Sequence, residues 1–211
     1  ENILLTATSE PGADYKWSTG STSQSISITP NATTPYQVTA TLNGCSNSDE
    51  VIVTVKPIPT VEAGDNQTIC RGDTVNITAT ATGGSSYLWS NAAEITQSIT
   101  VFPIINTSYI VTATLNGCSA SDNMIVFVNN IPTITISDDD TICLGQTINL
   151  VAVGPAGSSY AWSHGALTNS ITVSPTQNTT YVVTVTKNNC TNTESVIVLV
   201  NPAPFVNAGI D

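Results

Sequence analysis

The sequence predicts an all-β fold of tandem β-sandwich repeats, and three observations support this prediction. Thr, Ser, Asn and Val dominate the 211 residues, a composition typical of strands joined by polar turns. Several residue types recur along the chain at one fixed spacing. Between them, short runs of alternating apolar and polar residues follow one another at intervals of about eight to twelve positions, the pattern of a sandwich or barrel.

The repeat has a period of 72 or 73 residues. The tryptophans Trp17, Trp89 and Trp162 are separated by 72 and 73 residues, and a tyrosine lies two positions before each of them. A second tyrosine series with the same period consists of Tyr36, Tyr109 and Tyr181. The cysteines form two series with this period, Cys45, Cys118 and Cys190 in one and Cys70 and Cys143 in the other. A shared period of this kind indicates repeated structural units.

Turn residues divide one unit into strands. The alternating runs predict strands over residues 74–81, 87–89, 98–101, 109–114 and 124–128. The pairs Asn43-Gly44 and Asn116-Gly117 each stand between two alternating runs, which predicts a tight hairpin. Pro30, Pro103 and Pro175 follow the run that corresponds to residues 98–101, and they end this strand because proline cannot donate to a neighbouring strand.

The repeat also predicts the domain organisation. We expect one sandwich over residues 57–129 and another over 130–201, with a sandwich over 1–56 that lacks its first strand and the first strand of a further repeat over 202–211. The linkers between these units are short and contain proline. Because such linkers are extended and stiff, the sequence predicts a linear rod.

The repeated stretches resemble a known family. The segments AGDNQTICRGDTVNITATA, SSYLWSN and TSYIVTATLNGCSASDNMIVFVN are similar to the PKD-like and immunoglobulin-like repeats of large cell-surface proteins from gliding and related Bacteroidetes. The resemblance covers the whole chain and implies an immunoglobulin-like sandwich in each repeat. It also implies a secreted, extracellular protein of the cell surface, similar to the repetitive gliding-motility adhesins that type IX secretion exports.

The recurring aromatic residues are predicted to have structural roles. Trp17, Trp89 and Trp162 are expected in the core, on a strand that faces the opposite sheet, as in immunoglobulin-like sandwiches. The second tyrosine series is expected at a tyrosine corner, where the hydroxyl group hydrogen-bonds to nearby backbone, and it comprises Tyr36, Tyr109 and Tyr181. Ligand stacking is the alternative for these rings.

Charge and hydropathy exclude two classes of partner. Four Lys and Arg residues against fifteen Asp and Glu residues give a formal net charge of -11. A polyanion such as nucleic acid would be repelled, so no nucleic-acid partner is expected. No apolar run reaches the ~18–20 residues of a membrane-spanning helix, so no membrane insertion is expected in this chain.

The sequence contains no catalytic constellation. A nucleophile elbow, a phosphate loop and a recurring carboxylate pair are all absent, so no catalytic residue, organic cofactor or enzyme activity is expected. Asp138, Asp139 and Asp140 form the sharpest acidic cluster, and their oxygen atoms suit Ca²⁺. The alternative is a solvated acidic turn that keeps a strand edge from pairing.

The cysteines are expected to form disulfides, since an exported chain meets an oxidising environment. Successive strands of a sandwich reverse direction, which places Cys70 and the last hairpin of its own unit at opposite ends of one sandwich. This argument favours a bridge from Cys70 to Cys190 in the next unit, with partners for the other cysteines outside residues 1–211. The alternative is one bridge inside each repeat, Cys70 to Cys118 and Cys143 to Cys190, if the unit has one strand fewer.

The predicted fold and the family resemblance suggest two functions. The first is a structural stalk or filament segment of an exported, repetitive adhesin, whose partners are neighbouring repeats of the same chain and surface glycans or other cells. The second is a carbohydrate-binding or other ligand-binding sandwich module, because fold alone does not decide function. A glycan platform needs an exposed row of aromatic residues, whereas most aromatic residues here recur at core-like positions.

Overall fold

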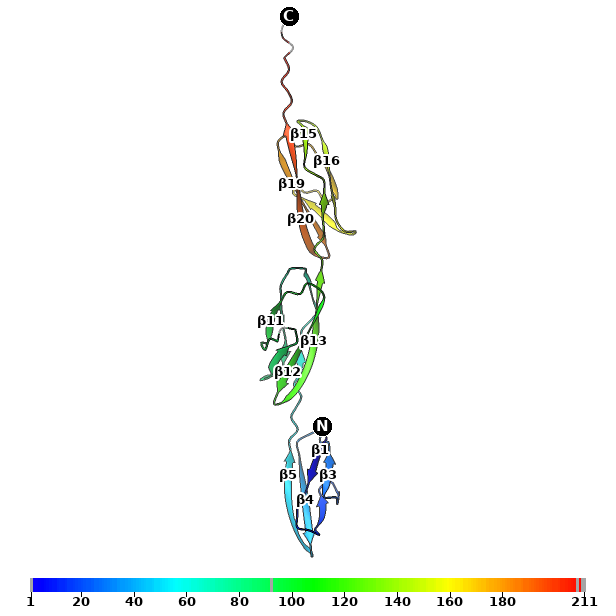
Figure 1. Cartoon of the computed structure of the whole chain (residues 1–211), viewed down its shortest axis with the longest axis vertical. Coiled ribbons are helices and arrows are strands. Elements are labelled where there is room, and N and C mark those ends of the chain that lie inside the picture. The colour runs from blue at the N-terminus through cyan, green and yellow to red at the C-terminus, as the bar shows by residue number, and fades with distance from the viewer. Residues whose placement is uncertain (1, 92, 208, 210–211) are drawn as a thin grey trace. The chain divides into compact units, whose positions relative to one another are not determined.

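The computed structural model describes residues 2–91, 93–207 and 209, and these residues form strands and turns only. Three immunoglobulin-like β-sandwiches follow one another along the chain, each with its own core (Figure 1). The all-β prediction of tandem immunoglobulin-like sandwiches is confirmed. The domain boundaries given above and the rod remain predictions.

The first sandwich has two small sheets. β1 pairs with β3 in one sheet, and the other sheet has the order β2-β4-β5. Alternation of buried and exposed residues along β3 and β4 turns one face of each sheet toward the core. The strands are β1 (Ile3–Thr6), β2 (Asp14–Trp17), β3 (Ser25–Ile28), β4 (Thr34–Leu42) and β5 (Cys45–Val53).

The second sandwich has more strands in both layers. One sheet has the order β10-β12-β13-β7, and two strand pairs, β11-β8 and β6-β9, complete the sandwich. β7 runs parallel to β13, and Cys70 is the Cα partner of Asn129. The strands are β6 (Val61–Glu62), β7 (Gln67–Cys70), β8 (Val75–Thr78), β9 (Thr80–Ala81), β10 (Ser86–Trp89), β11 (Ser98–Val101), β12 (Thr107–Leu115) and β13 (Cys118–Asn129).

The third sandwich repeats this arrangement. Its sheets have the orders β14-β16-β18 and β15-β20-β19-β17, and β15 runs parallel to β20. The strands are β14 (Thr135–Ile136), β15 (Asp140–Cys143), β16 (Ile148–Val153), β17 (Ser159–Trp162), β18 (Ser170–Val173), β19 (Thr179–Lys187) and β20 (Cys190–Asn201).

Two features of the strands differ from the sequence-based expectation. The strand predicted over residues 74–81 is divided at Ala79, whose backbone N–H and C=O both bond to Gln97. The segments that end in Cys70 and Cys143, which were not among the predicted strands, are the parallel strands β7 and β15. The opening segment of each complete repeat therefore contacts both sheets of its sandwich.

The three recurring tryptophans lie in the three cores. Each tryptophan is almost fully buried, and each indole Nε1–H donates to a backbone carbonyl. Trp17 donates to Ser23 over 2.9 Å, Trp89 to Thr96 over 3.1 Å and Trp162 to Thr168 over 2.9 Å. The burial of an aromatic ring with a satisfied N–H group stabilises the packing of the two layers.

The second tyrosine series is also buried, but its hydroxyl groups differ from the tyrosine-corner expectation. Tyr36, Tyr109 and Tyr181 pack with the cores of their own sandwiches. Among the described residues, none of the three hydroxyl groups bonds to the backbone, whereas Tyr160 accepts the N–H of Gly154 over 3.0 Å. Burial raises the pKa of Tyr109, because the phenolate form loses its water.

Contacts divide the chain into two compact units, and the division passes through the second sandwich. One unit comprises Glu1–Thr60, Ala81–Ser86 and Ala113–Ala120, and the other comprises Val61–Thr80, Tyr87–Thr112 and Ser121–Asp211. The first unit thus contains the first sandwich together with the hairpin between β12 and β13. The second unit contains the third sandwich and the strand β7.

Candidate functional site

Cys70 stands at the end of β7, in a turn that the neighbouring residues hold. The N–H of Asp73 donates to the carbonyl of Cys70 over 3.0 Å, and Oδ2 of Asp73 accepts the N–H of Cys70 over 3.2 Å. The next N–H, of Arg71, donates to the carbonyl of Asn129 at the end of β13 over 2.8 Å. Both strand pairing and turn geometry therefore fix the backbone of this cysteine.

The turn requires glycine at its third position. Gly72 has a φ of +100°, a backbone conformation that residues with a Cβ atom rarely adopt, and an added Cβ would meet no atom within 4 Å. Gly145 has the equivalent role after Cys143, with a φ of +90°. The Cys-x-Gly pattern in both repeats thus has a conformational reason.

We expect Gly72→Ala to lower the free energy of unfolding of the second sandwich by about 1–2 kcal/mol through backbone strain alone. Gly83→Ala is the matched control, because Gly83 lies in the same sandwich, has open space at its Cβ position and has no positive φ. This control should be neutral or slightly stabilising. Chemical denaturation of both variants measures the difference, and equal free energies would contradict the prediction.

Cys190 begins β20, directly after a tight hairpin turn. Asn188 and Asn189 have φ values of 49° and 63°, the two left-handed residues of a type I′ turn. Asn43-Gly44 and Asn116-Gly117 have positive φ values at both residues as well, so all three last hairpins share one geometry. The sequence prediction covered the two Asn-Gly pairs and missed Asn188-Asn189, although asparagine tolerates this conformation better than other side chains do.

A disulfide joins Cys70 to Cys190, and it therefore links the second sandwich to the third. The Cα atoms are 5.6 Å apart, and Cys190 is buried while Cys70 is half-buried. This is the pair that the strand-direction argument favoured. The alternative bridges inside each repeat are not formed, since Cys118 and Cys143 are free thiols, as is Cys45.

Two side-chain amides hold the same junction. Nδ2 of Asn129 donates to the carbonyl of Asn188 over 3.1 Å, and Nδ2 of Asn192 donates to the carbonyl of Pro132 over 3.0 Å. Asn129 and Pro132 flank the linker between β13 and the third sandwich. The disulfide is therefore one of three ties that restrain this short segment.

The first linker has matching contacts without the disulfide. Nζ of Lys56 donates to the carbonyl of Asn116 over 3.0 Å, and Sγ of Cys118 lies 4.0 Å from the carbonyl oxygen of Lys56. In the repeat, Lys56 corresponds to Asn129 and Cys118 to Cys190, whose Sγ lies 3.9 Å from the carbonyl oxygen of Asn129. At the linker between the first and second sandwiches, Cys118 thus has the position that Cys190 has at the next linker.

The acidic cluster does not form a metal site in the structure. Oδ1 of Asp139 accepts the N–H of Ile197, and Oδ1 of Asp140 accepts the N–H of Thr141, each over 2.7 Å. Across the described parts of the chain, no group of three or more His, Cys, Asp and Glu side chains lies close enough to hold a metal ion. The calcium hypothesis therefore has no geometric support, while Asp139 has a structural role that the sequence did not indicate.

One further finding concerns the membrane. The part of the chain that the structure describes holds no helix of the length and apolar character that crossing a bilayer requires.

Comparisons with known proteins show a similarity of fold only. No family model matches the sequence, and no curated protein matches it. Among solved structures, the chain is similar to Drosophila OTK extracellular domains 3–5 (13% identity, 95% of this chain and 92% of that chain, TM-score 0.42). It is also similar to an I-band fragment from titin (11%, 95% and 88%, TM-score 0.48) and to Sidekick-1 immunoglobulin domains 1–5 (15%, 96% and 56%, TM-score 0.37).

Proposed function

We propose that this chain is a load-bearing stalk segment of an exported, repetitive cell-surface adhesin of the gliding-motility type. The observation that carries the proposal is the Cys70–Cys190 disulfide, which ties consecutive sandwiches together at a short linker that two amide hydrogen bonds already restrain. A tie between repeats adds nothing to a ligand site within one sandwich. It stiffens the connection, which is what a stalk needs.

The extracellular location in this proposal rests on chemistry. Disulfides form and persist in oxidising compartments, and they are rare in the reducing cytosol. A formal charge of -11 with only 9% charged residues keeps a long polar molecule soluble through repulsion and hydration rather than through ion pairs. Both features suit a secreted protein that extends from a surface.

No observation favours the carbohydrate-binding alternative. The three tryptophans are buried, and the six tyrosines are buried or half-buried. The exposed aromatic residues are Phe102 after β11, Phe127 on β13 and Phe205 after β20, which belong to three different segments. A sugar-stacking platform of neighbouring exposed rings is therefore not formed by the aromatic side chains that the structure describes.

Small-angle scattering of the wild type and of Cys70→Ser tests the stalk proposal. We expect a narrow distribution of maximum dimensions for the wild type and a broader one for the variant, because the linker then loses its covalent tie. Cys45→Ser is the matched control, since Cys45 is a free exposed thiol. An unchanged distribution of maximum dimensions in Cys70→Ser, together with strong binding of the wild-type chain on a glycan array, would contradict the stalk proposal and favour the ligand-binding module.

A further inference from the structure

Six large apolar side chains are exposed on the second sandwich, three on the sheet β10-β12-β13-β7 and three in the loop between β11 and β12. Their exposed fractions range from 39% to 73%, and the three loop residues are the most exposed. This set, the apolar band, consists of Leu88, Ile110, Phe127, Phe102, Ile104 and Ile105. Contiguous exposed apolar surface of this kind marks an interaction site more often than scattered single residues do.

The three members on the sheet lie on its outer face. Each is next to a fully buried residue of its strand, and successive side chains of a strand point to opposite faces. The N–H of Ser90 donates to the carbonyl of Ile110 over 2.9 Å, which places these two residues opposite each other. Leu88 lies two positions before Ser90 and is therefore a diagonal neighbour of Ile110 on the same face.

The apolar face continues from β12 to β13. The hydroxyl groups of Thr112 and Ser121 lie 2.9 Å apart, so these two residues are opposite each other on the outer face. This register makes the half-buried Ile125 a diagonal neighbour of Ile110. Phe127 follows two positions after Ile125 and points to the same side. The strands β10, β12 and β13 thus present one continuous apolar stripe.

The loop after β11 joins this stripe at the end of β13. The N–H of Val128 donates to Oδ1 of Asn106 over 2.8 Å. Asn106 directly follows Ile105 in the loop, and Val128 directly follows Phe127 on the strand. The hydrogen bond therefore places the exposed loop beside the stripe, so that the loop extends the apolar face of the sheet.

The equivalent positions of the other two repeats are mostly polar or small. In the first repeat none of the six residues is large and apolar, and they are Lys16, Gln37, Thr54, Thr29, Asn31 and Ala32. In the third repeat the loop positions are polar and two of the face positions are large and apolar, the six residues being Ala161, Val182, Leu199, Ser174, Thr176 and Gln177. All three repeats form the same sandwich, so the fold does not require an apolar band at these positions.

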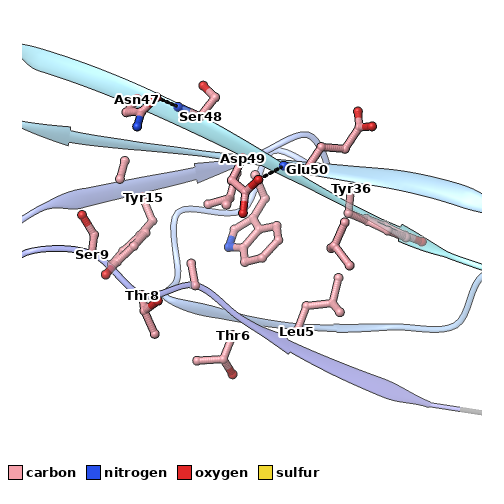
Figure 2. Close-up of a pocket in the computed structure, with 15 residues that line it drawn as sticks. Leu5, Thr6, Thr8, Ser9, Tyr15, Tyr36, Asn47, Ser48, Asp49 and Glu50 are labelled. Carbon is pink, nitrogen blue, oxygen red and sulfur yellow. Dashed lines mark hydrogen bonds between the residues drawn. The ribbon is translucent and has the colours of Figure 1, made fainter.

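The outer face of this sheet also differs in charge from that of the first sandwich. Within residues 87–112 and 121–129, the outer positions of β10, β12 and β13 hold only apolar, hydroxyl and amide side chains. The first sandwich has Lys16 and Glu50 at outer positions of β2 and β5, and Figure 2 shows the carboxylate of Glu50 on the opposite side of β5 from that of Asp49. In a chain with a formal net charge of -11, an uncharged face is where two copies meet without like-charge repulsion across the contact.

We propose that the apolar band is a contact surface between two copies of this chain, which pair through the same face of the second sandwich. Each of its side chains presents on the order of 100 Å² of apolar surface, so the band buries about 600 Å² on each copy. This area matches the lower end of specific interfaces, about 600 Å² per partner. A two-fold axis sets the same surface of one copy on that of the other, so one uncharged apolar face supplies both halves of the contact. The inference goes beyond the stalk proposal, because it joins two chains side by side.

Analytical ultracentrifugation of the full chain tests this pairing. The chain carries Cys45→Ser, Cys118→Ser and Cys143→Ser, so that no disulfide forms between copies while the Cys70–Cys190 bridge remains. We expect an equilibrium of monomer and dimer with a dissociation constant of about 100 µM or lower, because interfaces of this size are weak. A chain that stays monomeric at about 1 mM, tenfold above this constant, would overturn the proposal.

Ile110→Asp in this chain locates the contact. The variant should raise the dissociation constant of the dimer at least about tenfold, because each copy then carries a carboxylate into an apolar contact. Gln37→Asp is the matched control, since Gln37 is the exposed counterpart of Ile110 in the first sandwich and the net charge changes equally. The control should dimerise like the parent chain.

A second pair of variants avoids any effect on strand pairing. Ile105 is 70% exposed in a loop, so Ile105→Asp should fold normally and weaken the dimer, while Ala32→Asp at the exposed counterpart should not. A dimer that both Ile110→Asp and Ile105→Asp leave intact would overturn the proposal. Binding of the monomeric chain to phosphatidylcholine vesicles, lost in Ile105→Asp, would overturn it in favour of a lipid surface. Scattering at dilution, where the monomer predominates, tests the stalk proposal independently of these results.

Discussion

Replacement of Trp89 with alanine is expected to destabilise the second sandwich by about 3–5 kcal/mol, enough to unfold a domain of this size under many conditions. Trp89 is 0% exposed and packs with buried residues of both layers, among them Ile77, Ile99 and Val111. The truncation removes the ring from this core and leaves a cavity. It also leaves the carbonyl of Thr96 without its indole donor.

Leu88→Ala provides the control for this prediction. Leu88 precedes Trp89 on β10 and is 51% exposed, because successive side chains of a strand point to opposite faces. This truncation should cost less than about 1 kcal/mol. Calorimetry should show a separate low-temperature transition for Trp89→Ala only, and similar melting profiles for the two variants would contradict the core role of Trp89.

The repeat made most of the fold predictable. Residues at equal spacing occupy equal positions, so the tryptophans, the second tyrosine series and the hairpins could be placed from the sequence. The type I′ geometry followed from Asn-Gly pairs because few residues adopt two successive positive φ values. The third hairpin has Asn188-Asn189, a pair without the glycine on which the hairpin prediction rested.

The parallel strands were not predictable from local pattern. β7 is four residues long, and its partner β13 is distant in sequence, so no hairpin signal marks the pair. The same limit applies to the acidic cluster. Asp139 accepts a backbone N–H from Ile197 on β20, and this contact joins residues that are distant in the sequence. In the sequence alone, the three consecutive carboxylates were compatible with a calcium site as well as with a solvated acidic turn.

The disulfide could be predicted from the sequence because the pairing depends on the direction of successive strands. Cys118 and Asn129 are the two ends of β13, and Cys70 pairs with Asn129. Cys70 and Cys118 therefore lie at opposite ends of one strand, about 35 Å apart for a strand of this length.

The same connectivity determines how the chain carries tension. The disulfide closes a loop with a sequence separation of 120 residues. When the two ends of the chain are pulled apart, the force passes from Cys70 through the sulfur atoms to Cys190. Strands β8 to β19 lie inside the closed loop, so the covalent path between the two ends of the chain bypasses them and includes only β20 among the strands of the third sandwich.

We therefore expect the oxidised chain to stretch much less than its reduced form in a single-molecule pulling experiment. Loss of the bridge in Cys70→Ser frees the enclosed residues and should lengthen the fully extended chain by about 400 Å, at ~3.3–3.6 Å per residue. A reductant should give the wild type the same gain in length, while Cys45→Ser should pull like the oxidised wild type because its thiol is unpaired. Equal extension of wild type and Cys70→Ser under oxidising conditions would show that the bridge does not carry the load, and the load-bearing role of this junction would be wrong.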